Sequence, residues 1–255
     1  MLLAIDVGNS TTKLGLFAGT ELVDTWRLTT EARRSADEYG VLLLQLLARH
    51  RPAPEVEGVV VASVVPRLDA ITSEMCERYL GLTPMILGSG VDFGLPILTD
   101  YPEQVGVDRL ADAVAGRSLY GCPLITIDLG THTVFNAISA EGAFLGGAIV
   151  SGIATILDTV VQNTAKLPPV PLVPPPSAIG RNTMAAMQSG LVYGYVGLVE
   201  GLIHRMWAEM GRCRVVATGG HSHLIASQTT FIDEVDPDLT LHGLRLVYER
   251  NVARR

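Results

Sequence analysis

The chain contains one short pattern twice, and this repeat constrains its fold more than any other feature of the sequence. Residues 3–12 read LAIDVGNSTT, and residues 125–134 read ITIDLGTHTV. In each copy an apolar run ends in an aspartate, and glycine and hydroxyl residues follow. Glycine lets backbone N–H groups approach a phosphate, and serine and threonine add donors. Each copy is therefore typical of a buried strand that leads into a phosphate-binding turn.

The spacing of the two copies predicts a duplicated architecture. Asp6 and Asp128 are separated by about half of the 255 residues, and a chain of this length can form two domains of roughly 100–150 residues. We therefore expect one domain over residues 1–120 and a second over residues 121–255. A nucleotide should bind in the cleft between them, because each domain carries one phosphate turn.

Hydrophobic patterning predicts an α/β layer structure in both halves. In the first half we expect an antiparallel meander followed by alternating helices and strands: strands 2–6, 13–17 and 21–28, helix 36–49, strand 58–64, helix 66–80, strand 84–87 and helix 108–120. In the second half we expect strands 124–128, 134–138 and 143–149, helices 151–166 and 182–210, strand 214–217 and helix 239–249. Ser35 and Glu38 form a capping box, Pro66 suits a first helical position, and the prolines of 168–176 favour an extended segment.

Composition excludes several classes of function. A net charge of −7 and a pI near 5.3 argue against a nucleic-acid-binding surface. Cys76, Cys122 and Cys213 form no C-x-x-C pair, which indicates a reducing cytoplasm rather than disulfides or zinc. His221 and His223 have no third ligand at a useful spacing. The most apolar helical stretch, residues 191–199, is too short to span a bilayer, so we expect no membrane partner.

Four motifs occur in an order that resembles a known kinase family. They are DVGNSTTK at 6–13, GVDR at 106–109, DLGT at 128–131 and GRNT at 180–183, and TGG follows at 218–220. The P-loop motif G-x-x-x-x-G-K-[ST] is absent. Over essentially its whole length, the chain resembles the type III pantothenate kinases of the acetate and sugar kinase/Hsc70/actin superfamily. The resemblance implies a duplicated ribonuclease H-like (actin-like ATPase) fold with a mixed five-stranded sheet in each domain.

The resemblance also implies an activity, namely the ATP-dependent phosphorylation of pantothenate to 4'-phosphopantothenate at the start of coenzyme A biosynthesis. By this match Asp6 orients the ATP phosphates through Mg²⁺, and Asp128 holds K⁺ or NH₄⁺. The implied ATP-contacting residues are Val7, Gly8, Asn9, Ser10, Thr11, Thr12, Lys13 and Thr131. The implied pantothenate-contacting residues are Tyr101, Gly106, Val107, Asp108, Arg109 and Thr183.

Asp108 is the candidate general base. Phosphoryl transfer needs a carboxylate near the acceptor hydroxyl, which aligns it and takes its proton. The alternative is that Asp108 only caps the helix that follows. Arg109 presents a planar fork that suits a carboxylate or carbonyl, although a surface ion pair would also explain it.

The long second-half helix predicts a homodimer. In the family, the threonine that Thr183 matches reaches pantothenate from the partner subunit. Gly190/Gly194 and Gly197/Gly201 recur at four-residue spacing, which lets another helix approach closely. That other helix could belong to the same subunit or, as we favour, to a second copy.

The second turn departs from the family pattern. His132, Val134 and Asn136 stand where alanine, threonine and aspartate are expected. These changes suggest an alternative hypothesis, in which the chain is a catalytically weak or inactive nucleotide-binding regulator. A third hypothesis, a kinase for another small alcohol, rests on the generality of the fold.

Overall fold

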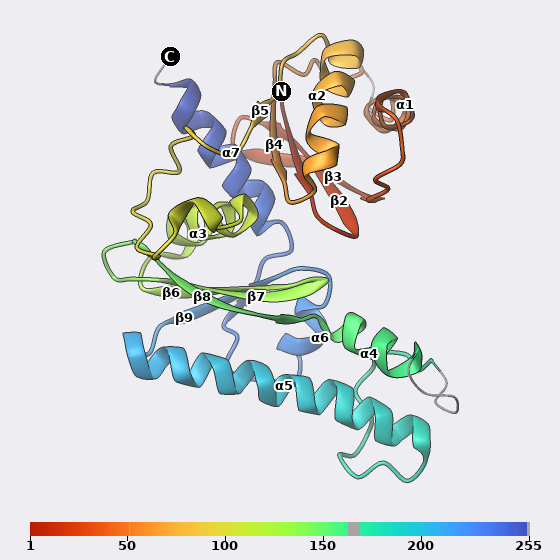
Figure 1. Ribbon diagram of the computed structural model, residues 1–255, viewed down its shortest axis with the longest axis vertical. Coiled ribbons are helices and arrows are strands. Elements are labelled where there is room, and N and C mark those ends of the chain that lie inside the picture. The colour runs from red at the N-terminus through yellow and green to blue at the C-terminus, as the bar shows by residue number, and fades with distance from the viewer. Residues whose placement is uncertain (51, 163–168, 254–255) are drawn as a thin grey trace. The chain divides into compact units, whose positions relative to one another are not determined.

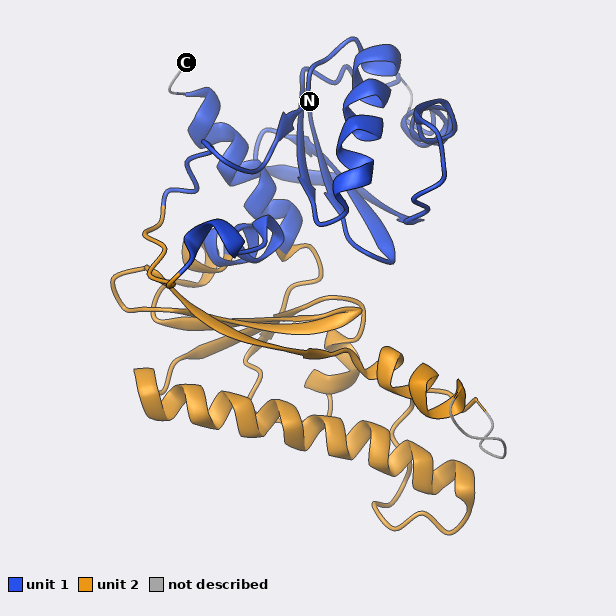
Figure 2. Cartoon of the chain, viewed as in Figure 1, with its two compact units in different colours: residues 1–94, 101–115, 240–255 blue, residues 95–100, 116–239 orange. Residues whose placement is uncertain are grey.

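A computed structural model describes residues 1–50, 52–162 and 169–253. The chain forms two compact units, shown in different colours in Figure 2. Unit 1 contains residues 1–94, 101–115 and 240–255, and unit 2 contains residues 95–100 and 116–239. Each unit is built around one sheet (Figure 1). The end of the chain thus returns to unit 1.

The sheet of unit 1 has the strand order β3-β2-β1-β4-β5. Its strands are β1 (Leu2–Val7), β2 (Thr11–Ala18), β3 (Glu21–Thr29), β4 (Gly58–Ser63) and β5 (Met85–Ile86). The first three strands pair antiparallel, and β4 pairs parallel with both β1 and β5. The predicted meander and the mixed five-stranded sheet are confirmed. Strands β1 and β4 are central, which explains their continuous apolar runs.

Two helices cover one face of this sheet. Helix α1 (Ala36–Leu47) begins with the predicted capping box of Ser35 and Glu38, and α2 (Pro66–Leu80) begins at the predicted proline. Their apolar faces join the sheet in a core that includes Ile5, Leu14, Leu43, Val61 and Leu68. Burial of these side chains away from water is the main stabilising contribution.

Helix α7 (Leu239–Val252) closes the opposite face of the first sheet. A Cβ built at Gly15 would lie 2.9 Å from the Leu241 side chain, and one built at Gly58 would overlap the Tyr248 hydroxyl. Glycine at both positions therefore lets α7 approach the strands closely. Helix α3 (Val107–Tyr120) packs beside α7, because a Cβ at Gly243 would overlap the Ala111 backbone.

The sheet of unit 2 repeats the plan, with the strand order β10-β9-β6-β7-β8. Its strands are β6 (Leu124–Leu129), β7 (His132–Ile138), β8 (Phe144–Ser151), β9 (Arg214–Thr218) and β10 (Glu234–Val235). Strand β6 occupies the place of β1, since it pairs antiparallel with β7 and parallel with β9. The predicted duplication of the fold is confirmed.

One long helix covers a face of the second sheet. The predicted helix 182–210 is confirmed as α5 (Thr183–Met210), with Asn182 as its N-cap, and it runs along the sheet in Figure 1. Val196, Val199 and Ile203 of α5 enter a core with the β6 residues Ile125 and Ile127. Among the described residues, no helix is long and apolar enough to cross a membrane.

A few expectations differ from the structure. Helix α4 (Ile153–Gln162) was predicted to continue to residue 166, but residues 163–168 lie outside the described part of the chain. Three short elements were not predicted: η1 (Pro102–Gln104), α6 (Ser222–Ala226) and β10. Elements of two to five residues are too short to show a hydrophobic period.

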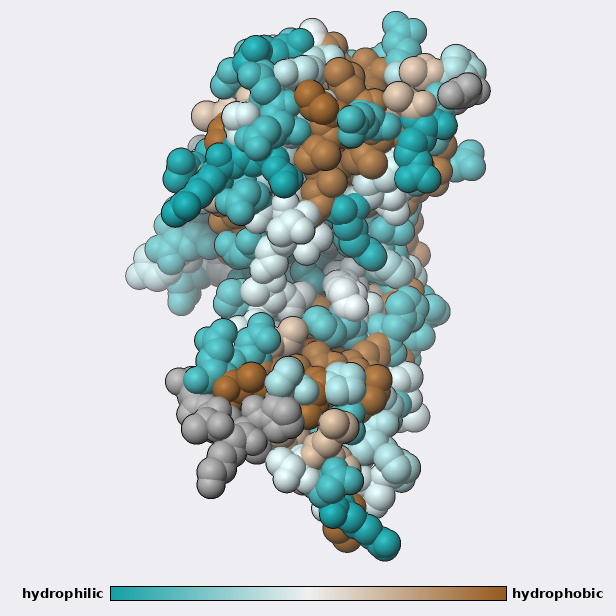
Figure 3. Space-filling model, turned by 90° about the vertical axis from the view of Figure 1, so that its right-hand side faces the viewer, coloured by the Kyte–Doolittle hydropathy of each residue, from teal (hydrophilic) through white to brown (hydrophobic). Residues whose placement is uncertain are grey.

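Some apolar residues remain exposed. Val41 and Leu44 of α1 are exposed, and so is Ile149 of β8. Figure 3 shows two groups of hydrophobic residues on the face that it views. Exposed apolar side chains are common on globular proteins. These residues carry no functional assignment.

Candidate active site

The first of the two repeated turns is a tight hairpin loop between β1 and β2. Val7 pairs with Thr12, and Asp6 pairs with Lys13. The Gly8 N–H donates to the Thr11 carbonyl at 3.1 Å, and a Cβ at Gly8 would lie 3.0 Å from that oxygen. Asn9, Ser10 and Thr11 are exposed at the tip of the loop. Their polar groups are therefore accessible to an anion, with the Asp6 carboxylate at the strand end.

The second turn is one residue shorter than the first. Leu129 pairs with Thr133 across the turn and Asp128 pairs with Val134. Thr133 is therefore the counterpart of Thr12, whereas counting residues from each aspartate would match Thr12 with Val134. Val134 takes the place that Lys13 has beside Asp6. Aligning the two sequence copies residue by residue therefore matches the two turns but places β7 one residue out of register with β2.

The end of β9 packs tightly against Asp128. Thr218 is the parallel partner of Asp128, and Gly219 follows with φ of +90°. A Cβ at Gly219 would overlap Oδ1 of Asp128 and would lie 2.7 Å from the Leu129 nitrogen. The Thr218 hydroxyl is buried, with no hydrogen-bond partner among the described residues. The Asp128 carboxylate thus lies at a strand end that also carries an unpaired hydroxyl oxygen.

Asp108 lies in the first turn of α3 and not at its N-cap. The helix begins at Val107, and the Leu110 N–H donates to the Gly106 carbonyl at 3.2 Å. Oδ1 of Asp108 accepts from the Arg109 N–H at 2.8 Å. A capping side chain instead accepts from an N–H two or three residues further on. The capping alternative is therefore not what the structure shows, and the carboxylate is only half-buried.

Gly106 is required by the position of the Asp108 side chain. A Cβ at residue 106 would lie 2.5 Å from Oδ1 of Asp108. Real Cβ atoms do not approach an oxygen this closely, so any side chain at 106 would displace the carboxylate. This contact gives a physical reason for the glycine two residues before the aspartate in the GVDR motif.

Arg109 lies between two carboxylates of the same helix. Burial lowers the pKa of the Arg109 guanidinium, whereas the charges of Asp108 and Asp112 act in the opposite direction. Asp112 is only 2% exposed and accepts a hydrogen bond of 2.7 Å from the Thr240 hydroxyl of α7. Asp112 was not among the residues predicted from the sequence, although its spacing of four residues from Asp108 places both on one helix face.

Replacing Thr240 with valine is expected to destabilise unit 1. The variant keeps the side-chain volume but removes a hydrogen bond to a buried carboxylate, which costs about 1–3 kcal/mol. The measurement is the free energy of unfolding in urea. Thr240→Ser keeps the hydroxyl and is the control, which should recover most of the loss. Equal stability of the valine variant and the wild type would contradict the prediction.

The predicted site residues lie in both units. Unit 1 contains residues 6–13, Tyr101 and residues 106–109, and unit 2 contains Asp128, Thr131 and Thr183. Tyr101 is 62% exposed, immediately before η1. Thr183 is exposed as the first residue of α5, where Asn182 accepts a hydrogen bond from the Ala185 N–H.

The three unexpected residues after the second turn fit the sheet. His132 is exposed, and Val134 lies across from Asp128. Asn136 is fully buried and donates to the Thr126 hydroxyl at 3.2 Å. Because the Asn136 amide has a partner inside the sheet, this substitution leaves the strand pairing intact.

Comparison with known proteins identifies close relatives of this chain. A family model described as type III pantothenate kinase matches residues 2–205. A type III pantothenate kinase of Moorella thermoacetica is 52% identical over 254 residues, which cover 98% of this chain and 100% of that protein. Another, of Myxococcus xanthus, is 49% identical over 255 residues, covering 99% of this chain and 100% of that protein.

Solved structures with the same fold are more distant in sequence. A ROK hexokinase from Thermus thermophilus has a TM-score of 0.52 at 13% identity, covering 98% of this chain and 99% of that chain. The (R)-2-hydroxyglutaryl-CoA dehydratase component A of Acidaminococcus fermentans has a TM-score of 0.54 at 12% identity, covering 100% of this chain and 99% of that chain. At these identities the likeness concerns the fold alone, and it agrees with the duplicated arrangement of two sheets.

Proposed function

The chain belongs to the type III pantothenate kinase family, and from this premise we propose that it transfers the γ-phosphoryl group of ATP to the primary hydroxyl of pantothenate. The product is 4'-phosphopantothenate, and the reaction opens coenzyme A biosynthesis. The observation that carries the proposal is the similarity to these kinases over nearly the full length of both chains. No observation favours the inactive regulator.

The residues of unit 1 suit the chemistry of the reaction. We assign the general base to Asp108, which takes the proton of the acceptor hydroxyl as the phosphoryl group arrives. Its half-buried carboxylate is exposed enough to meet a substrate and is kept in place by the Arg109 N–H. The assigned pantothenate contacts are Tyr101, Gly106, Val107, Arg109 and, from the partner subunit of a dimer, Thr183.

The first turn is assigned to the ATP phosphates. Exposed Ser10 and Thr11 and the backbone of Gly8 and Asn9 offer donors, and Lys13 supplies a positive charge opposite Asp6. Val7 and Thr12 form the base of the turn. The half-buried Asp6 carboxylate is a hard oxygen donor that fits Mg²⁺ bound through the phosphates. When bound, Mg²⁺ neutralises charge that develops on the transferring group.

The second turn is assigned to a monovalent cation, K⁺ or NH₄⁺, beside Asp128, and to an ATP contact at Thr131. The donor set fits such an ion, because the Asp128 carboxylate lies at the same strand end as the Thr218 hydroxyl, which has no partner in the described chain. The proposal therefore adds Thr218 as a candidate oxygen donor.

A homodimer is proposed on the face of α5 that carries its four glycines. Gly190, Gly194, Gly197 and Gly201 are exposed, and no described atom lies within 4 Å of a Cβ built at any of them. The buried residues Val192, Val196 and Val199 occupy the other side of the helix. These glycines thus serve no close packing within the described subunit, which supports a second copy as their partner. The cytoplasmic location and the domain boundary at 120/121 stay predictions.

A coupled ADP-release assay tests the proposed function. The purified chain should release ADP only when pantothenate, ATP and Mg²⁺ are all present, and K⁺ or NH₄⁺ should raise the rate. A panel of polyols in place of pantothenate is the control for a kinase of another small alcohol. ADP release that does not depend on pantothenate, or no release at all, would overturn the proposal.

A further inference from the structure

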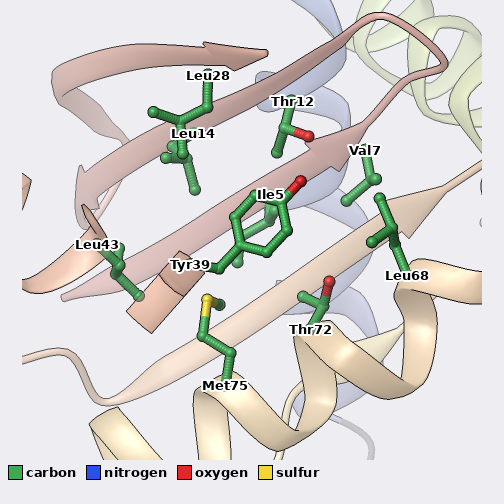
Figure 4. Close-up of a pocket in the computed structure, with 10 residues that line it drawn as sticks. All are labelled: Ile5, Val7, Thr12, Leu14, Leu28, Tyr39, Leu43, Leu68, Thr72 and Met75. Carbon is green, nitrogen blue, oxygen red and sulfur yellow. The ribbon is translucent and has the colours of Figure 1, made fainter. Parts of the chain in front are cut away.

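The interior behind the first turn is mostly apolar. Unit 1 encloses a cavity of about 20 Å³ between the sheet and helices α1 and α2 (Figure 4). Apolar side chains such as Leu14, Leu43 and Leu68 form most of its wall. Thr12 and Tyr39 also line it, and they are only 5% and 7% exposed. Buried hydroxyls need partners, so the partners of these two side chains indicate what they do.

Both hydroxyls connect to the segment that follows β3. Oγ1 of Thr12 lies 2.9 Å from Oγ1 of Thr30, and the Thr30 N–H donates to the Ser10 carbonyl at 3.0 Å. Thr30 thus contacts two residues of the phosphate turn. Tyr39 fixes the next residue, because its hydroxyl accepts from the Glu31 N–H at 3.0 Å and donates to the Glu31 carbonyl at 3.2 Å.

The second turn has an equivalent arrangement made from different residues. The Tyr195 hydroxyl of α5 lies 2.7 Å from Oγ1 of Thr133 and 2.8 Å from the Ser151 carbonyl. Thr133 has the same place in the second sheet as Thr12 has in the first. Ser151 ends the third strand of the second sheet, β8, just as Thr30 and Glu31 follow the third strand of the first sheet, β3. Thr133 and Tyr195 are 1% and 4% exposed.

We propose that these two hydroxyl pairs, Thr12–Thr30 and Thr133–Tyr195, hold the two turns in the shape that binds ATP, and that Thr30 and Tyr195 are positioning residues. The inference rests on the proposed function of the turns. Thr30 joins the start of β2 to the residue after β3, and Tyr195 of α5 joins the start of β7 to the end of β8 through its contacts with Thr133 and Ser151. When the turn already has this shape, ATP binding loses less conformational entropy, so the affinity for ATP is higher.

Packing alone does not account for these hydroxyls. Valine has nearly the same shape as threonine and would fill the same space without a hydroxyl that needs a hydrogen-bond partner. Phenylalanine would fill most of the space of Tyr195. Burial raises the pKa of the Tyr195 phenol, so it stays neutral and able to donate. The hydroxyls of Thr30 and Tyr195 instead restrain a rotamer, because each forms a hydrogen bond to one threonine next to a turn.

The test compares the Michaelis constants of two variants for the two substrates. Thr30→Val and Tyr195→Phe should each raise the KM for ATP by about five- to twentyfold, which corresponds to losing one or two hydrogen bonds. The KM for pantothenate should change by less than about twofold, the value expected for a residue with no role in binding it. Thr30→Ser keeps the hydroxyl and should restore most of the affinity for ATP.

Matched controls separate positioning from general loss of stability. Thr25→Val makes the same change at an exposed position of β3. Tyr193→Phe removes a hydroxyl of α5 that hydrogen-bonds to the Pro175 carbonyl instead of the turn. Both controls should leave the two KM values unchanged. The Tm of every variant is measured alongside.

The outcomes distinguish this inference from the proposed function. If the wild-type chain turns over pantothenate but Thr30→Val and Tyr195→Phe leave the KM for ATP unchanged, or raise both KM values equally, the inference is overturned. If the wild-type chain has no pantothenate-dependent turnover, the proposed function fails. The affinity of each variant for a fluorescent ATP analogue then decides the inference. Weaker binding by the variants than by the wild type supports it, and equal binding, or no binding by the wild type itself, overturns it.

Discussion

Asp108→Asn is expected to lower kcat by about 10²- to 10⁴-fold, the usual contribution of a general base. The amide has nearly the shape of the carboxylate and its oxygen can still accept from the Arg109 N–H, so the first turn of α3 should keep its geometry. It cannot take a proton from the acceptor hydroxyl. The measurement is single-turnover kinetics at saturating ATP and pantothenate, together with the KM for pantothenate, which should change little.

The loss of a helix-terminal charge has to be separated from the loss of the base. A carboxylate in the first turn of a helix contributes about 0.3–1 kcal/mol through the helix dipole. Asp69→Asn is the matched control, because Asp69 lies in the first turn of α2 within the same unit. It should show the same small change in stability and wild-type turnover. An Asp108→Asn variant with more than a tenth of wild-type kcat would rule out Asp108 as the base.

The sequence predicted the larger elements because their local patterns are strong. The β-branched run of β4, the capping box of Ser35 and Glu38 and the proline of α2 each depend on neighbours within a few residues. The same holds for the two turns, whose glycine and hydroxyl residues are consecutive. Local patterns thus predicted that Asp6 and Asp128 each end a strand that leads into a turn, whereas the strand order of the two sheets is seen only in the structure.

Two of the side-chain contacts near the candidate site are long-range, and no local pattern reveals them. Thr240 is 128 residues from its partner Asp112, and Tyr195 is 62 residues from Thr133. The one-residue difference between the turns is also a tertiary property, because strand register depends on which face each strand buries. The candidate reactive groups could therefore be proposed from the sequence, whereas the residues that contact them from distant parts of the chain could not.

Gly219→Ala is expected to cost about 2–4 kcal/mol of stability and to abolish most of the ATP-dependent activity. Gly219 has φ of +90°, where a Cβ alone costs roughly 1–2 kcal/mol. The methyl group would also overlap Oδ1 of Asp128 and the backbone of Leu129. The Leu129 backbone cannot move easily, since Leu129 pairs with Thr133 between β6 and β7. Relief has to come from moving Asp128 or the end of β9.

The adjacent glycine provides the control. Gly220→Ala introduces the same methyl group where the structure has no described atom within 4 Å of it and where φ is not in the left-handed region. That variant should unfold in urea within about 0.5 kcal/mol of the wild type, as surface substitutions usually do. If Asp128 binds the monovalent cation, Gly219→Ala should also lose the stimulation by K⁺ while Gly220→Ala retains it. Two variants with equal stability and equal response to K⁺ would show that β9 does not shape the Asp128 site.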